Sequence, residues 1–181
     1  MSEAVVAKRY AEALFQLAKE KGSIAEVQEQ LTVVKEVLNE NAQFVEVIQT
    51  PSISQDRKLQ AIDETFKSAH PFVLNLLKVL TERQRLNIAT EVVDAYANLY
   101  NEENGVAVVT VQSVRELSED EQASLKEIFK NQLSKQEVII KNEIDPSILG
   151  GIKAKVGNTI YDGSVSDKLN RLRNQIVSAT K

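Results

Sequence analysis

The fold is decided near the carboxyl end of the chain, in the stretch Val138–Val177, which reads VIIKNEIDPSILGGIKAKVGNTIYDGSVSDKLNRLRNQIV. It holds three apolar runs, a Gly150-Gly151 pair, an Asp162-Gly163 turn and one amphipathic helix. The runs and the helix predict four elements: strands at about Val138–Ile144, Ile152–Val156 and Thr159–Tyr161, and a helix at about Ser166–Ala179. This stretch is too short to form a core of its own, so it must belong to a larger unit.

The rest of that unit precedes it. VAVVTVQS, residues Val106–Ser113, has the β-branched content of a strand. Ser118 then caps a helix whose first turn carries three acidic residues, which favours a helix start because carboxylates stabilise the positive end of the helix dipole. The resulting order is β-α-β-β-β-α. The period of the apolar residues changes at Gly105, so we predict two domains, residues 1–105 and 106–181.

Residues 1–105 have a helical period almost throughout. Ser23 and Glu26 have the spacing of a capping box at the start of the second helix. Six helices are predicted: about Ala4–Glu20, from Ser23, Ala42–Gln49, from Ser54, Pro71–Glu82 and Leu86–Glu103. The sequence therefore predicts a mainly α protein, with an N-terminal six-helix bundle followed by a small α+β C-terminal domain.

Composition excludes several classes of function. The chain has no cysteine and one histidine, so thiol chemistry, disulfides and most metal sites are not expected. No run approaches the length of a membrane span and no signal peptide is evident, which predicts a cytoplasmic protein that is not integral to a membrane. The net charge is −4, and no concentrated basic face suggests nucleic-acid binding.

Candidate catalytic groups are few. Gly150-Gly151 lacks both phosphate-loop patterns and no helix start follows it, so a bend between strands is the better interpretation. His70 precedes Pro71 and is expected at the start of a helix. Asp162-Gly163 is expected to be a turn. We therefore predict no catalytic residue, no cofactor and no metal.

Surplus apolar surface is the better clue to function. Apolar residues of the first helix cover an arc of about 200°, about twice the width that a surface helix needs. The fifth helix is similar, with only a narrow polar strip. Either both helices are central in the bundle, or a seam between them accepts an amphipathic partner helix. Basic residues of the last 31 positions suggest either a solvated face or a docking surface for an acidic partner.

Several motifs carry a family resemblance that covers the whole chain: AKRYAEALFQLA from Ala7, TERQRLN from Thr81, V-x-I-x3-I-D-x2-I-x-G-G-I from Val138, V-G at Val156 and I-x-D-G-S-V from Ile160. The chain thereby resembles the δ subunit of the F-type ATP synthase, whose mitochondrial counterpart is the oligomycin-sensitivity-conferring protein. One departure is Ala154, where the family usually has a larger aliphatic residue.

The resemblance implies a non-catalytic stator subunit, one copy per complex, that links the catalytic head to the membrane sector. In that family a groove between the first and fifth helices receives the N-terminal helix of an α subunit. Carried over to this chain, the groove would use Tyr10, Ala11, Ala13, Asn75 and Val79. The C-terminal domain would engage the C-terminal ends of the paired b subunits, and here we place Leu169, Leu172 and Arg173. The chain would lie at the cytoplasmic face of the cell membrane and touch the membrane only through the complex.

Two other functions stay open at this point. A generic helical adaptor would share the bundle and differ only in its partner. A small enzyme would use Asp145 or Asp162 and would need a deep polar pocket beside that carboxylate. The C-terminal domain, of about 75 residues, is expected to be marginally stable alone and to exchange its amide protons faster than residues 1–105.

Overall fold

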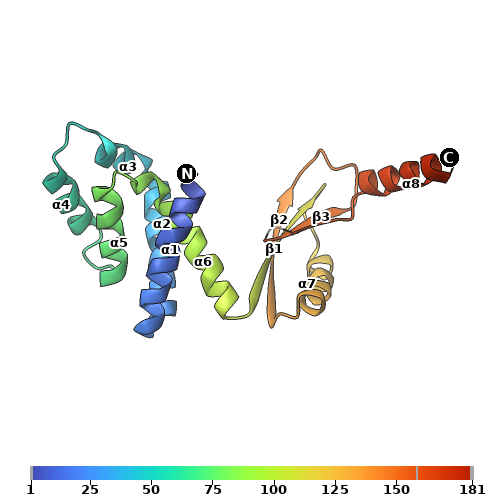
Figure 1. The fold of residues 1–181 in the computed structure, drawn as a ribbon, viewed down its shortest axis with the longest axis horizontal. Helices are drawn as coiled ribbons and strands as arrows, with labels where there is room; N and C mark the ends of the chain where they lie inside the picture. The colour runs from blue at the N-terminus through green and yellow to red at the C-terminus, as the bar shows by residue number, and fades with distance from the viewer. Residues whose placement is uncertain (1, 158, 180–181) are drawn as a thin grey trace. The chain divides into compact units, whose positions relative to one another are not determined.

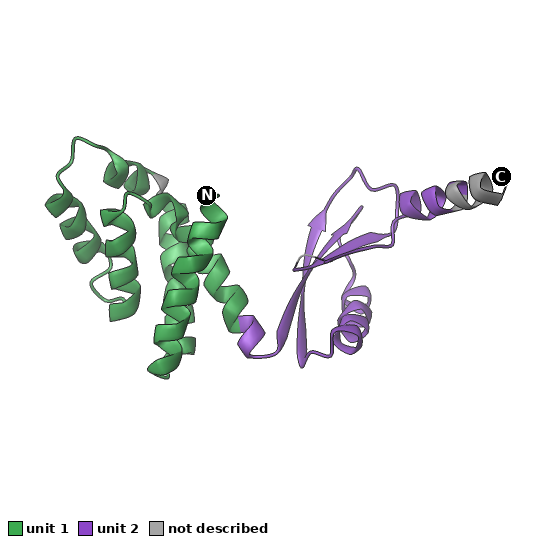
Figure 2. Cartoon of the chain, viewed as in Figure 1, with its two compact units in different colours: residues 1–100 green, residues 101–181 purple. Residues whose placement is uncertain are grey.

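The computed structural model describes residues 2–157 and 159–179, except for the side chains of Ala42, Leu172 and residues 174–179. It divides into two compact units, Met1–Tyr100 and Asn101–Lys181 (Figure 2). The expected mainly helical chain with one small sheet is confirmed (Figure 1). We describe each unit by itself.

Unit 1 is helical. Its elements are α1 (Glu3–Glu20), α2 (Ile24–Glu40), α3 (Ala42–Gln49), α4 (Gln55–Thr65), α5 (Pro71–Glu82), a 3₁₀ turn η1 (Leu86–Ile88) and most of α6 (Ala89–Glu103). Punctuation explains the bounds: Thr50-Pro51 follows α3, and Pro71 occupies the first turn of α5, where a missing N–H has no cost. Gly105, at φ +67°, follows α6 in the left-handed conformation expected of it.

The capping box predicted at Ser23 and Glu26 is wrong. The Ser23 N–H donates to the carbonyl of Ala18, and the Gly22 N–H donates to that of Lys19. These two bonds form a Schellman motif that closes α1, with Gly22 in the left-handed conformation at φ +68°. Because the Ser23 N–H is already used, it cannot also bond Glu26, and the Ser23 side chain makes no capping hydrogen bond.

Tyr96 is the central anchor of the core of unit 1. Its side chain is fully buried, its ring meets Phe15 edge to face at 5.4 Å between centroids, and its hydroxyl donates to the Ile24 carbonyl at 3.2 Å. Burial, and then the proximity of Tyr100, raises the pKa of Tyr96 to about 12. One residue of α6 thereby joins α1 and the start of α2. The predicted stripe of α2 is confirmed: Val27, Leu31, Val34 and Leu38 are buried.

Unit 2 contains a four-stranded sheet in the order β2-β1-β3-β4. Its elements are β1 (Val106–Ser113), α7 (Glu119–Leu133), β2 (Glu137–Ile144), β3 (Ile152–Val156), β4 (Thr159–Asp162) and α8 (Val165–Ala179). β1 and β2 are parallel, which requires a crossover connection, and α7 provides it and packs against β2. The pairs β1–β3 and β3–β4 are antiparallel.

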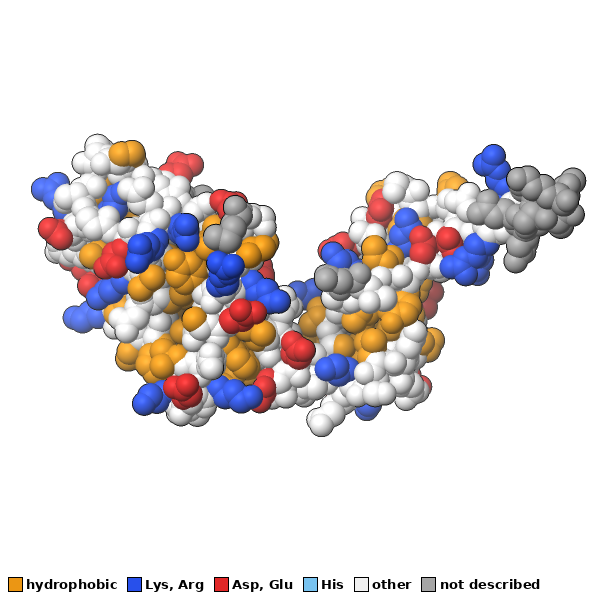
Figure 3. Space-filling model, viewed as in Figure 1, with side chains coloured by type: hydrophobic (Ala, Val, Ile, Leu, Met, Phe, Trp, Pro, Cys, Tyr) orange, Lys and Arg blue, Asp and Glu red, His pale blue; other side chains and the backbone are white. Residues whose placement is uncertain are grey.

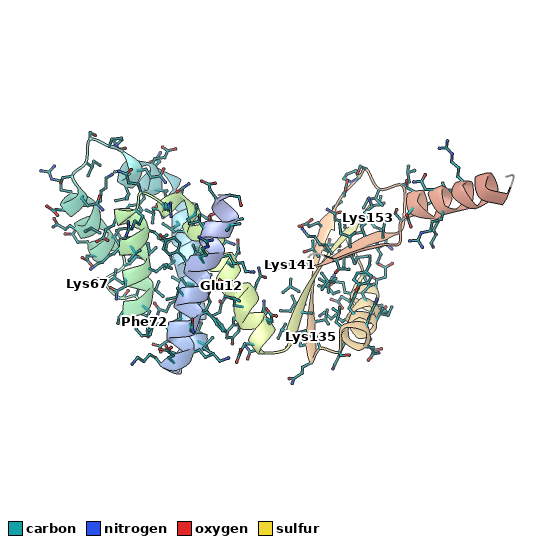
Figure 4. The ribbon with its side chains drawn as sticks, viewed as in Figure 1. Glu12, Lys67, Phe72, Lys135, Lys141 and Lys153 are labelled. Atoms are coloured by element: carbon teal, nitrogen blue, oxygen red, sulfur yellow. The ribbon has the colours of Figure 1, made fainter. Side chains whose placement is uncertain are left out.

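The two faces of this sheet differ. Alternate residues of β1 are buried, namely Ala107, Val109, Val111 and Ser113. The opposite face is polar: Thr110 pairs in register with Lys141 on one side and Lys155 on the other. Figure 4 labels Lys141 and Lys153 on the sheet. One face therefore forms the core of unit 2 and the other faces solvent.

Asn142 is a polar residue on the core side of β2. Its amide oxygen accepts a hydrogen bond from the Leu117 N–H at 2.8 Å, and its amide nitrogen donates to the Val111 carbonyl at 3.0 Å and to the Ser113 hydroxyl at 2.7 Å. These bonds fix the segment between β1 and α7. The next residue, Ser118, caps α7 and forms a true capping box with Glu121.

Candidate partner-binding surfaces

Helices α1 and α5 pack against each other, and each buries one side in the core of unit 1. The buried side of α1 is built from small residues and one leucine, and that of α5 is larger: Ala7, Ala11, Leu14 and Ala18 on α1, and Val73, Leu76, Leu77, Leu80 and Thr81 on α5. Small side chains let the α1 backbone approach its neighbours closely. Both helices are therefore central in unit 1, as one of the two interpretations held.

Apolar surface is nevertheless left over on both helices. Val79 on α5 is 40% exposed, and Leu17 on α1 is 39% exposed. Tyr10 and Phe72 are half-buried at the edge of the core. Figure 3 shows hydrophobic side chains gathered on the face of unit 1 where α1 and α5 run, and Figure 4 labels Phe72 on α5. Burial and a remaining apolar seam coexist on the same pair of helices.

The five residues predicted for the groove have different positions. Ala13 and Asn75 are exposed, Val79 is largely exposed, and Tyr10 is half-buried. Ala11 is 0% exposed. Ala11 is therefore a core residue that lets the helices pack, and it offers no surface to a partner. The remaining four form the surface that we call the α1–α5 seam. Leu17 and Phe72 also belong to it, because they continue the helical spacing of Tyr10-Ala13 and Asn75-Val79.

His70 is the N-cap of α5. The Phe72 N–H donates to its Nδ1 at 3.2 Å, and the His70 N–H donates to the side-chain oxygen of Gln30 on α2 at 3.2 Å. Its Nε2 lies 4.0 Å from a carboxylate oxygen of Glu26. The prediction that His70 stands at a helix start is confirmed. Because Nδ1 accepts a proton-mediated bond, the neutral imidazole carries its proton on Nε2.

The glycine signature in unit 2 is a close-packed corner. The Gly163 N–H donates to the Ile152 carbonyl, and the Val165 N–H donates to the Gly150 carbonyl, both at 2.9 Å. A Cβ on Gly151 would lie 2.5 Å from the Gly163 carbonyl oxygen. The interpretation of the Gly pair as a bend between strands is confirmed, and the bend is needed for the start of α8 to lie against it.

The two aspartates of the enzyme hypothesis stabilise turns. Asp145 accepts hydrogen bonds from the hydroxyl and the N–H of Ser147, and these bonds hold the pKa of Asp145 below its ordinary value. Asp162 accepts from the Ser164 N–H, and its hydrogen bonds with Ser164, followed by the nearby Lys153, lower its pKa as well. A carboxylate with a lowered pKa is a poor general acid. Asp162 borders only a shallow, largely apolar depression.

That depression belongs to a longer apolar surface between α7 and the sheet. Two adjoining hollows of about 370 and 430 Å³ share Leu125 and Ile152. Phe129 and Tyr161 meet edge to face at its floor, with ring centroids 5.8 Å apart. Asp120 and Glu121 border one hollow, and Arg171 of α8 borders the other. We call this surface the α7–sheet groove.

The residues predicted to meet the b subunits lie on α8. Leu169 is 55% exposed and Arg173 is exposed. The side chain of Leu172 lies outside the described residues. Sequence reasoning missed the α7–sheet groove, although Ile128 and Ile160, at 56% and 65% exposure, now stand out as unburied apolar residues beside it.

Metal and membrane sites were sought in the same part of the chain. Among residues 2–157 and 159–179, no group of three or more histidine, aspartate or glutamate side chains could hold a metal ion. None of the helices described there combines the length and the apolarity needed to cross a bilayer.

Comparisons with known proteins agree with one another. The family model "ATP synthase delta (OSCP) subunit" matches residues 6–176. ATP synthase subunit delta of Oceanobacillus iheyensis is 44% identical over 181 residues, 100% of both chains. The subunit of the same name from Lysinibacillus sphaericus is 42% identical over 98% of this chain and 99% of its own length. That of Priestia megaterium is 42% identical over 98% of both.

A solved structure has the same fold. A chain in the Toxoplasma gondii mitochondrial ATP synthase hexamer superposes with a TM-score of 0.77. The two chains are 24% identical, and the match covers 94% of this chain and 97% of the other. At this level of identity the likeness supports the fold, while the full-length relatives support the family.

Proposed function

Since the chain belongs to the ATP synthase delta (OSCP) subunit family, we infer that it is a stator subunit of an F-type ATP synthase. The observation that carries this conclusion is the end-to-end match with bacterial delta subunits. A stator holds the catalytic head still against the torque of the rotor, so that proton flow through the membrane sector drives ATP synthesis. We propose that the subunit itself is non-catalytic and works at the cytoplasmic face of the cell membrane.

The two units would divide this work. Unit 1, taken as the six-helix bundle of the family, would bind the catalytic head, and unit 2, taken as its α+β domain, would bind the peripheral stalk. The α1–α5 seam would receive the N-terminal helix of an α subunit. Its support is the exposed apolar surface of Val79 and Leu17 beside the half-buried Tyr10 and Phe72. An amphipathic helix laid on such a surface buries its own apolar face, and dissociation is then slow.

The stalk contact is proposed at unit 2. Leu169 and Arg173 on α8 offer one apolar and one cationic side chain, and the α7–sheet groove offers a longer apolar surface bordered by charges of both signs. The C-terminal ends of the paired b subunits would bind across these surfaces. Stator function needs extended contact and slow release, and both surfaces suit it better than they suit a small substrate.

The seam is tested by one substitution with a matched control. Val79→Asp places a charge on the exposed seam, and we expect it to raise the Kd for the isolated head by at least about tenfold, or roughly 1.4 kcal/mol. Val47→Asp on α3 is the control, because Val47 is 52% exposed and lies outside the seam. Circular dichroism should be unchanged in both. Equal affinity of the two variants would remove the seam from the interface.

A generic helical adaptor remains the alternative for the same bundle. The two functions differ in their partners, so purification of the tagged chain from a detergent extract of its own cells separates them. The stator function predicts co-purification of the α and b subunits in a fixed ratio to the chain. An adaptor would bring down another helical protein without them.

A further inference from the structure

A second surface of unit 1, separate from the seam, is strongly acidic. α2 carries four glutamates against one lysine, and α6 carries three glutamates and one aspartate with no lysine or arginine. The remaining positions of residues 1–105 have slightly more basic than acidic side chains. The negative charge of this half of the chain therefore comes from two helices.

A depression of about 530 Å³ lies on these helices. Residues of the outer side of α2 line it, together with Tyr100 near the end of α6: Ala25, Glu26, Gln28, Glu29, Thr32, Val33 and Glu36. The core residues of α2 lie on its other side, so this face is not used in folding. Val33 is 58% exposed, which is unusual for a residue at the centre of an otherwise polar helix face.

The charges at its rim are only partly balanced. Lys35 pairs with Asp94 of α6, and Glu26 lies near His70. No ion pair of Glu29 or Glu36 is present among the residues that the structure describes. The side-chain oxygen of Gln28 is buried there, and no described group donates a hydrogen bond to it. The depression thus offers an apolar floor, two unbalanced carboxylates and one acceptor that lacks a donor.

We propose that this depression is a second docking site on unit 1, and that its occupant is a cationic amphipathic helix of another subunit of the assembly. Apolar side chains of that helix would cover Ala25 and Val33. Lysine or arginine side chains would pair with Glu29 and Glu36, and one N–H group would satisfy Gln28. The seam fits a different partner surface, because no comparable acidic rim surrounds Val79, whose neighbour in sequence is Lys78. The head would then be held at two places on unit 1.

The test uses the full chain and a synthetic probe, an 18-residue amphipathic peptide of leucine and lysine, with a leucine–glutamate peptide as its control. Amide chemical shifts of the labelled chain should move at Ala25, Glu29, Val33 and Tyr100. Glu29→Lys with Glu36→Lys should weaken binding by at least about tenfold. The matched control is Glu46→Lys with Glu64→Lys, which changes the net charge equally on exposed positions of α3 and α4 and should leave affinity nearly unchanged.

Three results would overturn the proposal. Equal loss of affinity in both double variants would mean that the peptide follows net charge alone. Shifts confined to the α1–α5 seam would place the peptide there. A chain that sediments as a dimer, and becomes monomeric in the Glu29→Lys, Glu36→Lys variant, would make a second copy the occupant. Since the seam is not altered, failure here would leave the stator function standing.

Discussion

A Cβ added to Gly151 would lie 2.5 Å from the carbonyl oxygen of Gly163, closer than any real Cβ contact. Gly151 also has φ +78°, a conformation that L-residues adopt only at a cost. The strand after the glycine pair and the turn before α8 can meet only because position 151 has no side chain. The family signature is therefore a packing requirement of unit 2.

We expect Gly151→Ala to destabilise unit 2 by more than about 2 kcal/mol, since backbone strain of about 1–2 kcal/mol adds to the collision with a carbonyl group. Urea unfolding followed by circular dichroism measures the loss. Gly157→Ala is the control: it has φ +56° but nothing within 4 Å of the added Cβ. Equal losses in the two variants would show that the close approach to Gly163 is unimportant.

Asn142 gives a second prediction for the same unit. Asn142→Ala leaves the Leu117 N–H and the Val111 carbonyl without their partner, and an unsatisfied buried group costs about 1–3 kcal/mol. We expect a lower unfolding midpoint and faster amide exchange at Leu117. Asn131→Ala, on an exposed position of α7, should be nearly neutral. Normal protection of Leu117 in the Asn142 variant would contradict this account.

Acid should weaken the start of α7. A side-chain hydrogen bond from Arg115, and then the Ser118 backbone, lower the pKa of Glu121 to about 2 from an ordinary value of 4.5. Because the folded pKa is the lower one, its contribution to stability is present above about pH 4.5 and is lost as the pH falls toward 2. Glu121→Gln should reduce the slope of stability against pH in this window. An unchanged slope would show that the capping box does not respond to pH.

The two units should differ in local stability. The buried cluster of unit 1 draws on α1 to α6, whereas that of unit 2 is much smaller among the described residues, with Phe129 as its one buried aromatic side chain. Smaller cores protect their amides less. Hydrogen exchange of the isolated chain should therefore be faster in residues 106–181 than in residues 1–105. Uniform protection of both would count against the prediction.

Much of the secondary structure could be predicted from local signals. Helices Ala42–Gln49 and Pro71–Glu82, and strands Val106–Ser113 and Ile152–Val156, have the predicted bounds, because proline, glycine and β-branched residues act over short range. Ser23 misled the prediction for the opposite reason. Its spacing to Glu26 fits a capping box, but its N–H is already used by the end of α1. One donor cannot serve two motifs.

Tertiary relationships were harder to predict. Helical period gave the width of the apolar arc on α1 and α5 but not its depth, so it could not separate the buried Ala11 from the exposed Ala13. Asn142 drew no notice in the sequence, because a polar residue in a strand usually faces solvent. The α7–sheet groove depends on the order of the strands, which no local pattern specifies.

Reconstitution tests the central claim most directly. Membranes depleted of this subunit are mixed with catalytic heads that lack it, and head binding and ATP-driven proton pumping are measured before and after the purified chain is added. A stator subunit predicts that heads bind weakly and pump no protons until the chain is returned in equimolar amount, after which both recover. Heads that rebind and pump equally well without the chain would contradict the account.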